Sequence, residues 1–245
     1  MSKDNRILSV EIENYRQYYD KEKIDLSCRE EGFTIIAGKN GEGKSNLLNA
    51  ISWCLFHDEP HGVGEDDPEH RSDNKSLSVI NNRYITETKK ETTATTRVKI
   101  WIQDGADTYV VSRKLSVLKH ELKHKVLANG KKEILLTQFG LDRVPQGCEI
   151  FEELGGFVVM KKGPTDADFH DTITEADPRV KVEELLPREL SKYYLLDGEF
   201  LEGFWQKTSV IKAGVEQISQ LNLLSSLEKH IAQILPSTSG TGQET

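Results

Sequence analysis

The stretch Gly38-Lys39-Asn40-Gly41-Glu42-Gly43-Lys44-Ser45 fits the pattern G-x-x-x-x-G-K-[ST] of a phosphate-binding loop. The apolar run from Phe33 to Ala37 precedes it and predicts a buried strand. Apolar residues at helical spacing follow it and predict a helix from about Lys44 to Phe56. A chance match in a flexible loop is the alternative, but the order strand, loop, helix favours a nucleotide site.

Each residue type in this loop has a physical role in holding phosphate. Glycines let the backbone curl so that its N–H groups point inward, and the helix N-terminus adds partial positive charge. Lys44 is expected to reach the terminal phosphates, and the Ser45 hydroxyl to ligate magnesium. We therefore expect ATP and Mg2+ to be bound by Gly38, Lys39, Asn40, Gly41, Glu42, Gly43, Lys44, Ser45 and Asn46.

Strands are predicted on both sides of this loop and helix. Leu8, Val10 and Ile12 alternate with polar residues, and residues 97–118 alternate in the same way around a turn at Asp104-Gly105. Residues 57–95 are polar, rich in Gly, Pro and acids at their start, and predict a loop.

The later part of the chain has a more mixed pattern. Residues 140–180 are mixed and broken by Gly and Pro, and 182–190 predict a short helix interrupted by Pro187. The run from Tyr193 to Leu196 predicts a strand. Residues 209–235 predict an amphipathic helix with coiled-coil spacing, followed by a flexible tail at 236–245.

Composition excludes several classes of protein. The chain has 245 residues, of which 36% are hydrophobic and 29% charged, as expected of a soluble globular protein in the cytoplasm. No run approaches the roughly 20 apolar residues of a membrane span. Three widely spaced cysteines favour a reducing compartment over a disulfide framework or a zinc site. The net charge of -8 excludes a uniformly basic nucleic-acid coat but allows a local basic patch.

The N-terminal segment resembles the heads of the Rad50/SMC-like ATPases, a branch of the ABC-type ATPases. The resemblance rests on Glu13-Asn14-Tyr15-Arg16 after the first strand, on Asn40-Gly41 within the loop, and on the leucine-rich continuation into Ala50-Ile51. It implies that Arg16 contacts the nucleotide; a surface arginine is the alternative.

A second segment carries the resemblance further. Asp197-Gly198-Glu199, after an apolar run, is similar to the glutamine loop of these heads, with Asp197 in place of glutamine as a magnesium ligand. A Walker B strand with Glu199 as the base, or a plain strand-end turn, remain alternatives. The Asp-Gly-Glu version looks most similar to the DndD-type ATPases of DNA phosphorothioation and defence.

The resemblance also implies parts that this sequence does not show. A signature segment, a Walker B acid pair and a histidine switch are expected in the second half of such a head, so we expect the catalytic base outside this chain. A truncated piece of a longer protein and a naturally short chain with a separate partner both fit. The partners implied are a second ATPase head (as a homodimer or the missing C-terminal half), double-stranded DNA in the nucleoid, and a nuclease or other defence or repair subunit.

A basic cluster lies between 119 and 132, around a second turn signal at Asn129-Gly130. Lysines there could neutralise DNA phosphates without reading sequence, or could simply solvate the edge of a hairpin. The candidate DNA contacts are Lys119, Lys123, Lys125, Lys131 and Lys132.

The sequence as a whole predicts an α/β fold: half of a P-loop ABC-ATPase-type head over 1–208, with an antiparallel β lobe at about 97–140, and a C-terminal helix leading toward a coiled coil. The predicted function is ATP binding and, in the assembled head dimer, ATP hydrolysis that drives DNA processing, repair or anti-phage defence. The alternatives are a non-hydrolysing, nucleotide-gated scaffold and a standalone P-loop kinase of a small molecule.

Overall fold

The structure is a computed structural model that describes residues 5–27, 34–39, 42–59, 78–127, 129–139, 142–151, 156–171 and 177–195. The chain divides into two compact units, Met1–Arg188 and Glu189–Thr245. In the second unit the described residues include one short helix, α5 (Ser191–Tyr194). The fold described below is that of the first unit.

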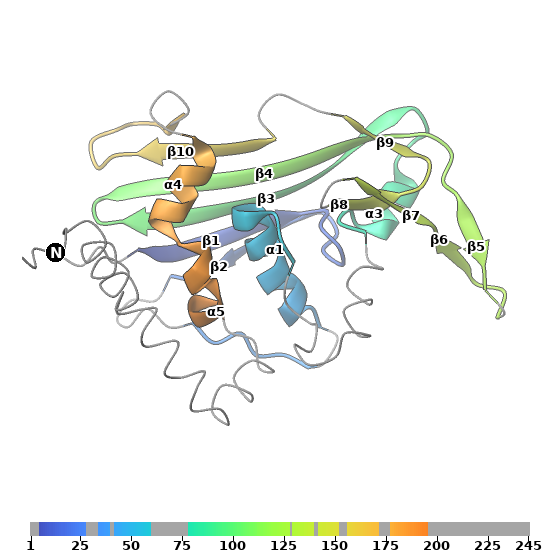
Figure 1. Ribbon diagram of the computed structural model, residues 1–245, viewed down its shortest axis with the longest axis horizontal. Helices are drawn as coiled ribbons and strands as arrows, with labels where there is room; N and C mark the ends of the chain where they lie inside the picture. The colour runs from blue at the N-terminus through green and yellow to red at the C-terminus, as the bar shows by residue number, and fades with distance from the viewer. Residues whose placement is uncertain are drawn as a thin grey trace, which may run out of the picture. The chain divides into compact units, whose positions relative to one another are not determined.

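A seven-stranded antiparallel sheet forms the centre of the first unit (Figure 1). Its strand order is β11-β10-β4-β3-β1-β2, and β9 pairs with the far end of β4. The strands are β1 (Arg6–Glu13), β2 (Lys21–Asp25), β3 (Thr92–Asp104), β4 (Asp107–Lys119), β9 (Cys148–Phe151), β10 (Phe157–Lys162) and β11 (His170–Asp171).

The long hairpin of β3 and β4 follows directly from the sequence pattern. Val98, Ile100 and Ile102 are buried and alternate with less buried neighbours, because successive side chains of a strand point to opposite faces. Gly105 has a φ of +61° in the turn between Asp104 and Asp107, a conformation that glycine adopts without strain. The strand predicted around Leu8, Val10 and Ile12 and the strands predicted at 97–118 are therefore confirmed.

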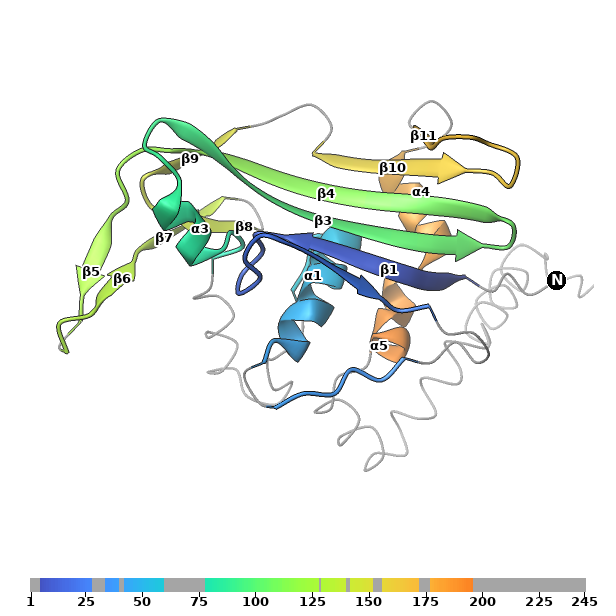
Figure 2. The same cartoon turned by 180° about the vertical axis from the view of Figure 1, so that it is seen from behind.

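Two smaller ladders stand beside the main sheet. One pairs β5 (His124–Val126) with β6 (Lys132–Ile134) around the predicted Asn-Gly turn, and the other pairs β7 (Leu136–Phe139) with β8 (Asp142–Pro145). Both views show the β5–β6 hairpin extending away from the main sheet (Figures 1 and 2).

Helix α1 (Lys44–Phe56) confirms the predicted helix after the phosphate loop. It lies on the same face of the sheet as α4 (Pro178–Leu185), as Figures 1 and 2 show. Every residue from Leu47 to Leu55 is buried, against β3 and β4 on the sheet side. Burial of a side chain the size of Ile51 stabilises the fold by about 1.5–3 kcal/mol, so α1 is anchored by packing along its length.

The remaining helices are α3 (Asn82–Glu87) and the 3-10 turn η1 (Arg188–Leu190). Asp177 caps α4 by accepting the backbone N–H of Arg179, and Pro178 occupies its first turn. The predicted helix at 182–190 therefore begins earlier, and Pro187 separates it from η1 as expected.

Several predictions are wrong. Residues 34–39 form no strand, and the Ile35 side chain is 78% exposed. A strand needs a neighbour for its backbone N–H and C=O groups, and no described strand lies beside this segment. The predicted strand at 193–196 begins within a helical turn, because a short apolar run does not distinguish helix from strand.

The polar and mixed stretches contain more structure than the sequence predicts. Residues 82–87 of the predicted loop form α3, and β3 already begins at Thr92. Four strands, β8 to β11, lie within the stretch interpreted as mixed. The predicted helix at 209–235 and the tail at 236–245 lie outside the described residues.

Candidate nucleotide site

The phosphate loop ends in a glycine that the geometry requires. Gly43 precedes α1 with a φ of +98°, in the left-handed region that L side chains rarely adopt. A Cβ at this position would lie 1.6 Å from Nε2 of Gln17. Any larger residue would therefore be strained and would push Gln17 away from the loop. Asn40 and Gly41 of the motif lie outside the described residues.

Lys44 folds back over the loop that precedes it. Its Nζ donates to the carbonyl oxygens of Gly38, at 2.7 Å, and Lys39, at 2.9 Å. Ser45 lies beside it in the first turn of α1. The ammonium and the hydroxyl that the motif assigns to phosphate and magnesium therefore both lie at the N-terminal end of one helix.

One backbone N–H group of the loop donates a hydrogen bond to a carboxylate of the same loop. Glu42 Oε2 accepts the backbone N–H of Lys39 at 2.7 Å. This carboxylate oxygen is an anionic acceptor, as a phosphate oxygen would be, so the loop has the geometry to hold an anion. The Lys44 ammonium, the Ser45 hydroxyl and this N–H together fit ATP with magnesium.

The Asn14-Tyr15-Arg16 element lies against the start of α1. Arg16 Nη1 donates to Oδ1 of Asn46 at 3.1 Å, and Asn46 Nδ2 donates to Oε1 of Gln17 at 2.8 Å. Tyr18 Oη donates to the carbonyl oxygen of Gly43 at 3.3 Å. Two predicted site residues, Arg16 and Asn46, are thus hydrogen-bonded to each other beside the loop.

Arg16 has a second, carboxylate partner that sequence reasoning missed. Its Nη2 lies 2.8 Å from Oε2 of Glu59, and the Tyr15 hydroxyl donates to the other oxygen of the same carboxylate. Tyr15 is fully buried, and burial raises the pKa of its phenol well above the usual value, with the negative charge of Glu59 adding to the effect. Glu59 belongs to an acid-rich polar stretch, so no pattern in the sequence distinguishes it.

A second polar network holds the other end of α1. Trp53 Nε1 donates to Oδ1 of Asp142 at 2.8 Å, and His57 Nε2 lies 2.9 Å from its Oδ2. The Trp53 and Tyr15 rings pack with centroids 5.5 Å apart. Trp53 is a buried packing residue, and its indole N–H has the partner that a buried indole requires.

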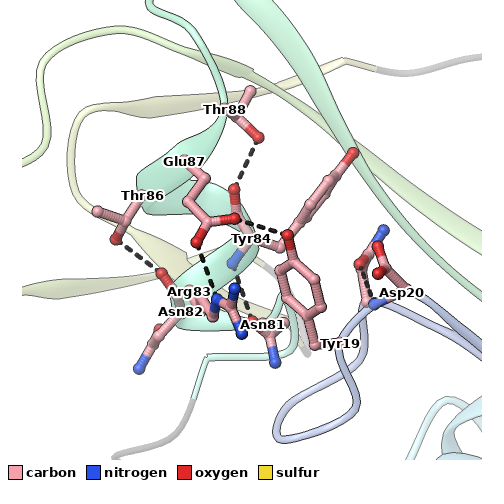
Figure 3. Close-up of polar contacts among 10 residues, drawn as sticks. Tyr19, Asp20, Asn81, Asn82, Arg83, Tyr84, Thr86, Glu87 and Thr88 are labelled. Atoms are coloured by element: carbon pink, nitrogen blue, oxygen red, sulfur yellow. Dashed lines mark hydrogen bonds and ion pairs between the residues drawn. The ribbon is translucent and has the colours of Figure 1, made fainter.

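Helix α3 braces the turn that follows β1, and Figure 3 shows Tyr19 of this turn beside Arg83 and Glu87 of the helix. Asn81 caps the helix by accepting the Tyr84 N–H at 2.9 Å and also donates to the Arg16 carbonyl oxygen at 2.7 Å. The Arg83 guanidinium stacks 4.3 Å from the Tyr19 ring centroid, and Glu87 accepts from both side chains. The stretch predicted as a loop therefore contributes supports to the candidate site.

The predicted DNA contacts separate into two groups. Lys119 is buried, and its Nζ donates to the carbonyl oxygens of Thr86, at 2.8 Å, and Thr88 at the end of α3. Its ammonium is therefore buried and hydrogen-bonded within the fold, which corrects the prediction that Lys119 contacts DNA at the surface. The exposed group is Lys123, Lys125, Lys131 and Lys132, on or beside the β5–β6 hairpin. Asp197, the predicted magnesium ligand, lies outside the described residues.

Two classes of feature are absent from the described part of the chain. No helix in it is both long and apolar enough to cross a bilayer. Within those same ranges, no three His, Cys, Asp or Glu side chains are grouped so that they could hold a metal ion. Cys54 and Cys148 are free thiols.

The chain is similar to known proteins at two levels, a family model and short stretches of individual proteins. Residues 9–153, more than half of the chain, match the family model described as AAA domain. The chromosome partition protein Smc of Lactiplantibacillus plantarum is 44% identical over 50 residues, which are 20% of this chain and 4% of that protein. The structural maintenance of chromosomes protein 1 of Caenorhabditis elegans is 49% identical over 47 residues, 19% of this chain and 4% of that protein. The similarity thus spans a small part of each relative's length.

Proposed function

This chain belongs to the AAA domain family, and we propose that it binds ATP through Gly38–Asn46 and serves as part of an SMC-like ATPase head. The observation that carries the proposal is the loop itself. Its left-handed Gly43, the ammonium of Lys44 and a backbone N–H that already holds a carboxylate converge at the start of α1. Local sequence identity to the two chromosome proteins supports the same conclusion.

Within this site the residues would share the work of holding the nucleotide. The loop N–H groups and Lys44 would hold the phosphates. Arg16, whose guanidinium also pairs with Glu59, would approach the nucleotide through its place beside Asn46. Ser45, with Asp197, would hold magnesium, which when bound offsets the negative charge of the phosphates. ATP hydrolysis would need a base from a second head or from the other half of this one.

The exposed segment before the loop supports an incomplete head. Ile35 and Ile36 are exposed although they are apolar and lie directly upstream of the phosphate loop. Exposed apolar residues that pair with no strand of the described ranges are suited to pairing with another polypeptide segment. We propose that a second half of the head, in this chain's own protein or in a partner, covers them.

The process that the ATPase drives is proposed from the relatives. Both relatives are named for chromosomes, so double-stranded DNA is the proposed partner of the assembly. The Asp197-Gly198-Glu199 element favours the phosphorothioation and defence branch of the family, with a nuclease or other defence or repair subunit as a further partner. A nucleotide-gated scaffold that never hydrolyses ATP is the second candidate, because the sequence leads us to expect the catalytic base outside this chain.

Substitution of the loop lysine tests the proposal. Lys44→Ala removes the ammonium that bridges the loop carbonyls and should abolish ATP binding in calorimetry or fluorescent-nucleotide titration. Lys90→Ala, which removes an exposed lysine from the turn before β3, is the matched control and should bind as the wild type does. Tight binding by Lys44→Ala would refute the assignment. Robust ATP turnover by the 245-residue chain alone would favour a standalone kinase-like enzyme over a half-head.

A further inference from the structure

The β5–β6 hairpin carries its lysines in an ordered way. Its ladder pairs His124 with Ile134, Lys125 with Glu133 and Val126 with Lys132. Two further hydrogen bonds continue the same register, from Leu127 N–H to the Lys131 carbonyl oxygen and from Leu135 N–H to the Lys123 carbonyl oxygen. Cross-strand partners share a face, and residues two apart along a strand share a face.

This register divides the hairpin into two unlike faces. Lys123, Lys125, Leu127, Lys131, Glu133 and Leu135 fall on one face, which we term the lysine face. His124, Val126, Lys132 and Ile134 fall on the other, where Val126 is 65% exposed. Three of the four exposed lysines are thus gathered on one side, and a single carboxylate opposes them.

The root of the hairpin is fixed to the rest of the unit. The Gln146 N–H donates to the Leu135 carbonyl oxygen at 2.7 Å, and the Lys123 N–H donates to the Gln146 carbonyl oxygen at 3.1 Å. Gly147, with a φ of +89°, lets this turn approach Glu121 so closely that a Cβ would lie 1.9 Å from its carbonyl oxygen. Because an isolated two-stranded hairpin is marginally stable in water, these bonds matter for holding the lysine face in one orientation.

We propose that the lysine face of the β5–β6 hairpin binds the phosphate backbone of double-stranded DNA without reading its sequence. A chain with a net charge of -8 repels DNA on average, so a contact must be local and set apart from the rest of the chain. The hairpin meets both conditions, since it extends away from the main sheet (Figures 1 and 2). Lysines two residues apart on a strand are about 6.8 Å apart, and each strand of a duplex places a phosphate about every 3.4 Å along the helix axis. Neighbouring lysines of this face can therefore contact different phosphates of the same backbone.

The residue types on the hairpin favour a duplex over other nucleic acids. Residues 121–135 contain no Phe, Tyr or Trp on which unpaired bases could stack, and no Arg that could bind a guanine edge with two hydrogen bonds. Lysine instead acts as a point charge toward phosphate. The proposal rests on the DNA partner of the proposed function but on different residues from the ATP site.

Glu133 gives the proposal a prediction of definite sign. Glu133 is the register partner of Lys125, so it lies on the lysine face, where its negative charge opposes the field that attracts phosphate. Glu133→Gln should therefore strengthen binding, by roughly threefold to tenfold at low salt. Lys125→Gln should weaken it by a similar factor and lower the slope of log affinity against log salt by about 0.9.

The test is fluorescence anisotropy with the full chain and a labelled duplex of about 25 base pairs, titrated at several salt concentrations. Lys132→Gln removes the same charge from the opposite face and should change affinity less than Lys125→Gln does. Equal effects of these two variants, no gain from Glu133→Gln, tighter binding of single strands than of duplex, or no duplex binding by the wild type would each overturn the proposal. ATP binding by the same samples, measured separately, distinguishes failure of this inference from failure of the nucleotide assignment.

Discussion

Removing the charge of Glu59 should destabilise the protein through Arg16. The Arg16 side chain is 2% exposed and that of Glu59 19% exposed, with 2.8 Å between the paired nitrogen and oxygen. Loss of one partner of a buried ion pair costs 3–5 kcal/mol. Because solvent reaches part of Glu59, we expect Glu59→Gln to lose about 3 kcal/mol, the lower end of that range. This corresponds to a roughly 150-fold change in the unfolding equilibrium.

A double-mutant cycle isolates the charge pair from other effects. Urea unfolding is followed by tryptophan fluorescence, to which Trp53 contributes beside Tyr15. Arg16→Met removes the arginine charge but keeps an apolar stem, so Glu59→Gln should cost little in that background. Glu22→Gln, on an exposed position of β2, controls for loss of a carboxylate. The reasoning is refuted if Glu59→Gln costs less than about 0.5 kcal/mol, or costs the same with and without Arg16.

Three further predictions concern single residues. Gly147→Ala should lower stability by about 1–3 kcal/mol, because φ is +89° and the new Cβ would meet a backbone carbonyl. Gly130 also has a positive φ, +77°, but a Cβ there would meet no atom within 4 Å. Gly130→Ala should therefore lower the stability by less than Gly147→Ala in the same urea titration. Burial raises the pKa of Cys54 to about 12, so little thiolate is present at pH 8. Alkylation of Cys54, followed by mass spectrometry, should be about three orders of magnitude slower in the folded protein than in protein unfolded in urea. Equal rates in the two states would contradict its burial. Hydrogen bonds, first to Glu91, raise the pKa of His120. Its stabilising contribution is therefore full below the ordinary histidine pKa and lost as pH rises through the raised value. His120→Gln should accordingly lower the urea midpoint in acidic buffer and leave it nearly unchanged in alkaline buffer, and an equal change in both buffers would contradict the prediction.

Local patterns predicted the elements whose partners are close in sequence. The helix from Lys44 to Phe56 and the hairpin of β3 and β4 were predicted because their periodicity and turn residues are contained in one segment. The strand predicted from Phe33 to Ala37 is not present in the described residues 34–37. A strand depends on a neighbouring strand, which the apolar run itself does not encode.

The residues of the candidate site also divide into those that a local motif identifies and those whose partners are distant in sequence. The glycines, Lys44 and Ser45 are contained in one short motif, so the sequence alone identified them. Glu59 and Asp142 could not be identified in this way. Glu59 meets Tyr15 across 44 residues of chain, and Asp142 meets Trp53 across 89. Each is an ordinary acid in sequence and becomes a partner only when the tertiary fold brings the segments together.

The long β3–β4 hairpin has a consequence for how the protein is made. Its two strands are joined by a short turn, with Asp104 opposite Asp107, so they can pair as soon as residue 119 has left the ribosome. β1 emerges much earlier but joins β3 only when Gln103 arrives opposite Arg6. Helix α1 likewise lacks β3 and β4, the strands on which it packs, until they have been made. During synthesis the phosphate-loop motif is therefore complete long before the surface that supports it, and a nascent chain stalled between them would display the motif without a folded nucleotide site.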